Sequence, residues 1–249
     1  MTPILKKPLL ALALTAIALL PACAQPEAGT ASKAELEKII HDYIVEHPEV
    51  VEEALIALGD REKAAKAAAA QAAIKANAQK LYAHASDYSI GPADAKVTIV
   101  EFFDYRCGFC KRSADWVREL PEAYDGQVRV VYKELPIFGG ISENAALATL
   151  AAGKQGKYVD LHMALMALKS NDDLTEKKID ELAGAVGINV AKMRADMKSS
   201  AVQKQLADMK ELGKLLDVGG TPGFFIGDQH IEGANVPAVE AAIDAALKS

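Results

Sequence analysis

The segment 97-VTIVEFFDYRCGFCKRSADW-116 joins an apolar run to a charged stretch, and it carries two cysteines at the junction. The apolar run predicts a buried strand, and residues 111–124 have the composition of a helix. A second apolar run, 128-VRVVYKEL-135, follows. A strand, a helix and a strand in this order predict a β-α-β unit within a parallel sheet.

The residues after this unit extend it into a larger domain. Residues 141–217 are predicted to be helical, with breaks such as 153-GKQG-156. Two short strands, 224–226 and 230–232, flank a tight turn and predict a hairpin before a last helix. The sequence therefore predicts an α/β domain over residues 88–249, with a helical insert at about 141–217. The net charge of −6 gives no indication of a nucleic-acid partner.

Residues 1–24 have the pattern of a bacterial-type signal peptide. Lys6 and Lys7 precede the apolar run 9-LLALALTAIALL-20, and 22-ACA-24 offers a cleavage site of small residues. The run is short for a membrane span, which argues against a membrane anchor. A lipoprotein acylated at Cys23 is the other alternative. We favour simple secretion and expect export to the periplasm, with no membrane span after processing.

Residues 25–85 are predicted to form a leader and a helical stalk. The sequence 32-SKAE-35 predicts the start of a helix, and five apolar residues follow at helical spacing: Leu36, Ile39, Ile40, Tyr43 and Ile44. The Ala-rich stretch 62–85 has high helix propensity but few large apolar side chains. Because the apolar stripe has no partner within its own segment, it favours self-association. A solvated linker, or an arm folded back on the main domain, is the alternative.

The number of cysteines limits the kinds of site that the junction can form. After removal of residues 1–24, or lipidation at Cys23, only Cys107 and Cys110 remain as thiols. A disulfide between them closes so short a loop that it stabilises the fold very little. A closed zinc site needs four nitrogen or sulfur ligands, and the histidines are scattered along the chain: His41, His47, His84, His162 and His230. A reactive redox pair, or Cu(I) held by two thiolates, stays open.

The positions of the two cysteines predict different reactivities. Cys107 lies where the strand ends and the helix begins, so the first helical N–H groups and the helix dipole favour its thiolate. Cys110 lies one turn further, more deeply buried, and can resolve a mixed disulfide formed at Cys107. In an exported chain, a C-x-x-C pair in this context predicts a thiol–disulfide redox site. We expect it to need no cofactor and no metal.

Three stretches resemble the DsbA-like branch of the thioredoxin superfamily: 97-VTIVEFFDYRCGFC-110, 134-ELPIFGG-140 and 219-GGTPGFFIG-227. The resemblance covers about residues 88–249 and implies a thioredoxin fold with an inserted helical domain. It also implies a cis peptide bond between Thr221 and Pro222 beside the cysteines. The backbone of Thr221 would then be exposed for strand-like pairing with a substrate peptide.

The same resemblance implies a role for a buried acid. Glu101 lies six residues before Cys107 and matches a buried acid of this family. Lys133, on the next strand, is expected to be its partner. The functional interpretation is a proton relay to Cys110, and a buried structural ion pair is the alternative.

The stretch 35-ELEKIIHDYIVEHPEVVEEAL-55 resembles the N-terminal segment of the suppressor-of-copper-sensitivity protein C (ScsC) family. Some members of that family are homotrimeric disulfide isomerases, and others are monomers with different activity. The resemblance implies an exported isomerase, with a homotrimer favoured. It would act on client proteins and be kept reduced by a membrane-bound reductase of the DsbD or ScsB type. A monomeric dithiol oxidase of DsbA type and a copper-tolerance protein that binds Cu(I) through the reduced pair are the alternatives.

Overall fold

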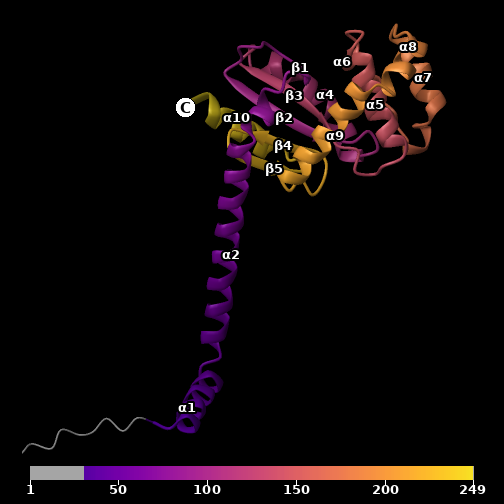
Figure 1. Cartoon of the computed structure of the whole chain (residues 1–249). Helices are drawn as coiled ribbons and strands as arrows, with labels where there is room; N and C mark the ends of the chain where they lie inside the picture. The colour runs from indigo at the N-terminus through magenta and orange to yellow at the C-terminus, as the bar shows by residue number, and fades with distance from the viewer. Residues whose placement is uncertain (1–30, 249) are drawn as a thin grey trace, which may run out of the picture. The chain divides into compact units, whose positions relative to one another are not determined.

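The computed structural model describes residues 31–248, so the predicted signal peptide and Cys23 lie outside the described residues (Figure 1). The chain divides into two units, and the boundary falls between Leu58 and Gly59. Helix α1 (Lys33–Glu46) belongs to the first unit, and helix α2 (Glu49–Ala76) begins in the first unit and ends in the second.

The second unit is built on a five-stranded sheet in the order β1-β3-β2-β4-β5. The strands are β1 (Tyr88–Ile90), β2 (Val97–Phe103), β3 (Val128–Glu134), β4 (Gly223–Ile226) and β5 (Gln229–Glu232). Strands β2 and β3 are parallel and are joined by α4 (Gly108–Ala123), whereas the other neighbouring pairs are antiparallel. The predicted β-α-β unit is confirmed.

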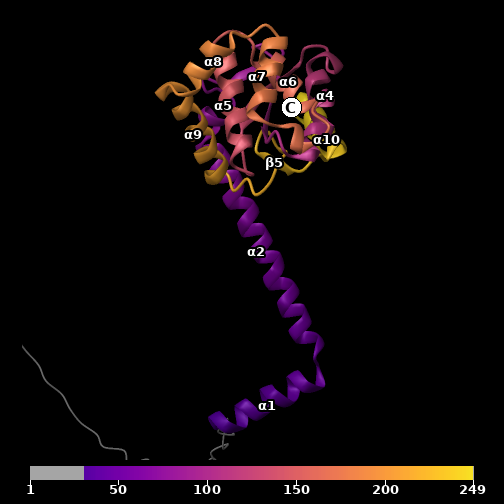
Figure 2. The ribbon, with the colours of Figure 1, turned by 90° about the vertical axis from the view of Figure 1, so that its right-hand side faces the viewer.

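The segment between β3 and β4 is helical. It contains α5 (Ile141–Gly153), α6 (Tyr158–Met166), the 3-10 turn η1 (Asn171–Asp173), α7 (Glu176–Ala185), α8 (Val190–Met197) and α9 (Ser200–Leu215), and α10 (Val236–Lys248) follows β5. Figure 1 shows α5 to α8 beside the sheet, and Figure 2, seen from that side, shows them nearest the viewer. This arrangement is a thioredoxin fold with an inserted helical domain, as the sequence predicts.

Side chains alternate between the two faces of the sheet along each strand, so the apolar core forms one cluster on each face. Ile99 shares one apolar cluster with residues of α4 and α10. Val100 points to the opposite face and shares a second cluster with Ile74 of α2 and Leu81 of α3 (Ala78–Tyr82). The end of α2 and all of α3 therefore belong to the packed second unit. The boundary expected at residue 85 falls inside that unit, because Ile74 and Leu81 fill its core.

Strand β1 is an element that the sequence analysis did not predict. Its three residues pair antiparallel with β3, from Tyr88 opposite Tyr132 to Ile90 opposite Val130. The turn that follows requires Gly91, which has φ +87° and whose added Cβ would lie 2.5 Å from the carbonyl oxygen of Val128. So short a strand has too few residues to show the alternation by which strands are recognised.

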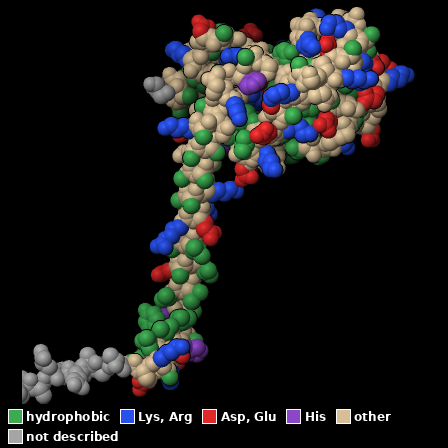
Figure 3. Space-filling view, in the orientation of Figure 1, with side chains coloured by type: hydrophobic (Ala, Val, Ile, Leu, Met, Phe, Trp, Pro, Cys, Tyr) green, Lys and Arg blue, Asp and Glu red, His purple; other side chains and the backbone are tan. Residues whose placement is uncertain are grey.

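The first unit begins at the capping box that the sequence predicts. The Ser32 hydroxyl accepts a hydrogen bond from the N–H of Glu35, and the Glu35 carboxylate accepts one from the N–H of Ser32. Helix α1 ends before Pro48, since proline disfavours a helical residue in front of it. No residue of α1 is buried. Figure 3 shows hydrophobic side chains gathered over α1 and the start of α2.

Candidate active site

Two free thiols lie at the junction of β2 and α4. Cys107 directly precedes α4, and its N–H donates to the carbonyl oxygen of Asp104 at 3.0 Å, which closes the turn between strand and helix. Cys110 lies in the first turn of the helix and is fully buried, whereas Cys107 keeps 6% of its surface exposed. Only Cys107 is therefore open to a reaction partner.

The surroundings of Cys107 favour its thiolate. Its pKa is lowered to about 5, first by a hydrogen bond from the Cys110 thiol, then by Thr221 and by the N–H groups of Cys110 and Phe109. Burial opposes this shift but is outweighed. With a pKa near 5, Cys107 is a thiolate at neutral pH and hence a nucleophile.

Cys110 is held in the opposite state. Burial raises its pKa far above the usual range, and the neighbouring Cys107 and the carboxyl group of Glu101 raise it further. Cys110 is therefore a protonated thiol, which must lose its proton before it can attack a disulfide. The pKa values of the two cysteines are shifted in the opposite directions that their positions in the sequence predict.

The loop before β4 lies against Cys107. The Thr221–Pro222 peptide bond is cis, and the Cys107 thiol, when protonated, donates to the carbonyl oxygen of Thr221 at 3.1 Å. The Thr221 hydroxyl oxygen is buried and has no hydrogen-bond partner among the described residues. Its proton is consequently available to the Cys107 thiolate.

Glu101 lies on the face of β2 that carries the cysteines' core. Only 2% of its surface is exposed, and its pKa is raised to about 8, mainly by burial and also by the negative charge of Cys107. Its carboxyl group in turn raises the pKa of Cys110. A carboxyl group with a pKa near neutrality, coupled to a thiol that must lose a proton, has the properties of a general base.

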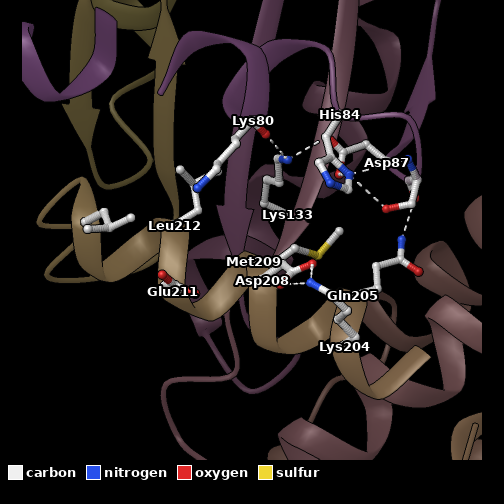
Figure 4. Close-up of a pocket in the computed structure, with 12 residues that line it drawn as sticks. Lys80, His84, Asp87, Lys133, Lys204, Gln205, Asp208, Met209, Glu211 and Leu212 are labelled. Carbon is white, nitrogen blue, oxygen red and sulfur yellow. Dashed lines mark hydrogen bonds and ion pairs between the residues drawn. The ribbon is translucent and has the colours of Figure 1, made fainter. Parts of the chain in front are cut away.

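Lys133 is not the partner of Glu101, and this part of the predicted relay is wrong. In the parallel pair of β2 and β3, Glu101 lies opposite Tyr132 and Lys133 lies opposite Phe102, so Lys133 points to the other face. Its ammonium group donates to Asp87 Oδ2 at 2.6 Å and to the carbonyl oxygen of Lys80 at 2.7 Å, as Figure 4 shows. Lys133 is one partner in a buried ion pair at the bottom of a separate pocket.

Asp104 is a residue of this region that the sequence analysis did not single out. Its buried carboxylate accepts hydrogen bonds from the N–H of Arg106 at 2.6 Å, the N–H of Phe138 at 3.1 Å and the hydroxyl of Ser142 at 2.8 Å. It therefore fixes the turn before Cys107 to the loop after β3. The sequence contains an indication of this role, because an aspartate directly after an apolar strand needs hydrogen-bond donors when it is buried.

Glu134 is a second buried carboxyl group that the sequence analysis did not single out. It accepts hydrogen bonds from the hydroxyl of Tyr158 at 2.8 Å and that of Tyr105 at 3.1 Å. Burial raises its pKa well above the usual range. Because Tyr105 stands two residues before Cys107, this cluster ties the active-site turn to α6.

Neither a metal cluster nor a membrane helix is found between residues 31 and 248. No three His, Cys, Asp or Glu side chains of this part lie together as a metal site would require. None of its helices has the length and apolar character needed to cross a membrane.

Comparison with known families places this site in context. The DSBA-like thioredoxin domain matches residues 98–243, which include both cysteines and the cis-proline. The chain belongs to the DsbA-like thioredoxin family. This family is one of thiol–disulfide oxidoreductases. A second family, the copper resistance protein ScsC N-terminal domain, matches residues 33–65.

Several solved structures resemble this DsbA-like chain. BcfH of Salmonella enterica Typhimurium is 29% identical with a TM-score of 0.70, and the match covers 86% of this chain and 95% of BcfH. Proteus mirabilis ScsC in a transitional conformation is 30% identical with a TM-score of 0.64, over 86% of this chain and 96% of that one. The catalytic domain of the same ScsC is 30% identical with a TM-score of 0.65, over 72% and 99%.

The curated relatives are larger proteins. The Na(+)/H(+) antiporter NhaA 3 of Salinispora tropica is 31% identical over 166 residues, which are 66% of this chain and 25% of the antiporter. NhaA 1 of Salinispora arenicola is 29% identical over 164 residues, 65% of this chain and 25% of that protein. The DsbA-like chain thus spans about a quarter of the length of these relatives. Ion transport is a property of those proteins and is not carried over to this one.

Proposed function

We propose that the chain is an exported disulfide isomerase, which reshuffles wrong disulfides in periplasmic client proteins. The Cys107 thiolate attacks a client disulfide, so one Cys107–client bond forms and one client sulfur leaves as a thiolate. Another client thiolate then attacks the mixed disulfide and releases Cys107 unchanged. No electrons are lost in this cycle, and the client ends with a different disulfide.

When no client thiol attacks the mixed disulfide, Cys110 resolves it. In the mixed disulfide Cys107 carries no negative charge, so one cause of the raised pKa of Glu101 is removed and its carboxylate can accept a proton. Cys110 passes its proton to this carboxylate, its thiolate attacks the sulfur of Cys107, and the client leaves as a thiolate with its disulfide reduced. The protein is then oxidised by two electrons, which a membrane-bound reductase of the DsbD or ScsB type must return. The carbonyl oxygen of Thr221, which precedes the cis-proline Pro222, lies 3.1 Å from the reacting sulfur, and the Thr221 backbone is expected to pair there with an extended client segment.

The observation that carries the isomerase proposal is the exposed apolar surface of α1 and the start of α2. Its large side chains have between 36% and 65% of their surface exposed: Leu36, Ile39, Ile40, Tyr43, Ile44, Val45, Val50, Val51, Leu55, Ile56 and Leu58. An apolar surface of this extent is unusual for a monomer and marks an interaction site. We propose that copies of the chain associate through it as a homo-oligomer, with a trimer favoured.

Association explains why isomerisation, rather than oxidation, would result. Several Cys107 sites around one client act at high effective concentration, so a second thiol engages before the first has been oxidised. The match of residues 33–65 to the N-terminal domain of ScsC supports this role for the segment.

A deletion of residues 25–58 tests the proposal. The deletion must stop there because Ile74 and Leu81 belong to the core of the second unit. The shortened protein should be a folded, redox-active monomer by light scattering, with most of its activity on a scrambled, multi-disulfide substrate lost. A substitution Leu55→Asp should have the same effect without a deletion, and Arg61→Asp, which adds an acid outside the apolar stripe, is its control. A full-length protein that is already monomeric, or a shortened one that isomerises equally well, contradicts the proposal.

The same preparations distinguish the alternatives. A dithiol oxidase of DsbA type would oxidise reduced clients faster than it rescues scrambled ones. A copper-tolerance protein would bind one Cu(I) per reduced pair tightly enough to compete with a thiol chelator, since two thiolates are ligands that Cu(I) prefers.

A further inference from the structure

Two exposed aromatic rings flank Cys107, and each has an arginine beside its face. The Phe109 ring is 57% exposed, and the guanidinium carbon of Arg112 lies 4.3 Å from its centroid. The Phe138 ring is 52% exposed, and the guanidinium carbon of Arg106 lies 5.7 Å from its centroid. Both distances are within the range of a cation–π interaction. We call these four side chains the arginine–aromatic rim.

Both halves of the rim are held by the backbone around the active site. The carboxylate of Asp104 binds the N–H groups of Arg106 and Phe138 together. Phe109 and Arg112 lie on the first turns of α4, whose start is fixed by Cys107. The rim is therefore positioned by the same turn that positions the thiolate, and Arg106 and Phe109 stand within two residues of Cys107 in the chain.

Neither guanidinium group of the rim is neutralised by a direct ion pair in the described part of the chain. Neither Arg106 nor Arg112 forms an ion pair with a carboxylate within residues 31–248, whereas Arg118, further along α4, pairs with Asp115 and Glu119. The carboxylate of Asp104, two residues before Arg106, is buried and bound to backbone N–H groups. In a chain with a net charge of −6, the rim thus presents two guanidinium groups that no carboxylate of residues 31–248 pairs with directly.

We propose that the arginine–aromatic rim selects extended client segments that carry an aspartate or glutamate within a few residues of the reacting cysteine. The rings provide apolar contact for any segment, and the guanidinium groups pair with client carboxylates, which the chain itself does not supply. Arg106 and Arg112 are thereby specificity-determining residues. The inference rests on the proposed role of Cys107 as the attacking thiolate.

Peptides with an activated disulfide test this selection directly. Three peptides differ only in the residues on either side of their single cysteine, which are glutamate, glutamine or lysine, and each carries thionitrobenzoate on that cysteine. Cys107 attacks the peptide sulfur, the Cys107–peptide disulfide forms, and thionitrobenzoate leaves as a coloured thiolate. The second-order rate constant is read from its absorbance with the reduced, full-length protein.

The glutamate peptide should react about tenfold faster than the lysine peptide at low ionic strength, because charge complementarity acts mainly on association. The preference should shrink at about 0.5 M salt. The double variant Arg106→Gln, Arg112→Gln should bring the rates of the glutamate and lysine peptides together. Arg118→Gln removes the same charge from the same helix and should leave the preference intact.

Three outcomes would overturn the inference. The wild type could show no preference, the double variant could keep it, or the double variant could slow all three peptides equally. Equal slowing would mean that the arginines act on the thiolate rather than on the client. A wild type that reacts with none of the peptides would instead contradict the proposed function of Cys107.

Discussion

Replacing Glu101 by glutamine should stabilise the reduced protein at neutral pH and at the same time slow its chemistry. The carboxyl group is buried, and its pKa is raised from 4.5 to about 8. Between these two values the folded protein keeps a proton that the unfolded chain has released. The free energy of unfolding therefore falls as the pH rises through this window.

The size of the effect follows from the two pKa values. Each unit of difference corresponds to about 1.4 kcal/mol, so at pH 7 ionisation of Glu101 in the unfolded chain costs about 3 kcal/mol of stability. At pH 5 the same comparison gives about 1 kcal/mol. Glutamine has the same shape and no charge, so the free energy of unfolding of the Glu101→Gln variant should exceed that of the wild type by these amounts.

The Glu101→Gln substitution should stabilise the protein but slow its reaction. Cys110 is a buried, protonated thiol, and the Glu101→Gln substitution removes the carboxyl group that is electrostatically coupled to it. Loss of a general base slows a step about 100-fold or more. The release of a client from the mixed disulfide should be slowed accordingly, whereas the first attack by Cys107 should keep its rate.

Urea unfolding of the reduced protein at pH 5 and pH 7 measures the first effect, and single-turnover release of a peptide thiol measures the second. Glu119→Gln, on the exposed side of α4, is the control, and it should change neither quantity. The reasoning is refuted if Glu101→Gln stabilises the protein equally at both pH values, or if peptide release keeps its rate.

Three further changes test the remainder of the site. Iodoacetamide at about pH 6 should label Cys107 long before Cys110, because only Cys107 is a thiolate there; equal labelling of the two in peptide mass spectrometry would contradict this. Thr221→Val removes a hydroxyl donor beside the thiolate, so the reduction potential against glutathione should fall by about 30 mV for each tenfold loss of thiolate stability. Lys133→Met leaves Asp87 buried without its ammonium partner and should cost about 3–5 kcal/mol in urea unfolding, while the Cys107 pKa and the reduction potential stay unchanged.

The parts of the structure that the sequence predicted are those with local causes. The capping box at Ser32 depends on a residue three positions away, and the β-α-β unit depends on two apolar runs and the helix between them. The unequal reactivity of Cys107 and Cys110 also has a local cause, since one residue precedes the helix and the other lies inside it. Such features need no knowledge of what packs against the segment.

The errors came from contacts between distant residues. The sequence analysis assigned residues up to 85 to the stalk, because their large apolar side chains are few, yet Ile74 of α2 and Leu81 of α3 pack with Phe225, far along the chain. Pairing Glu101 with Lys133 required the register of β2 against β3. A shift of one residue moves a side chain to the opposite face, and composition contains no information on register.

That register has a consequence for how the molecule works. Glu101 and the core beneath the cysteines occupy one face of β2 and β3, while Lys133, Asp87 and the end of α2 occupy the other. The proton of Cys110 is thus transferred on one side of the sheet. The end of α2 packs on the other side. Substitutions that loosen this packing, such as Leu81→Ala, should lower stability without changing the pKa of Cys107. Because chemistry and attachment use opposite sides of the same two strands, each can be altered without the other.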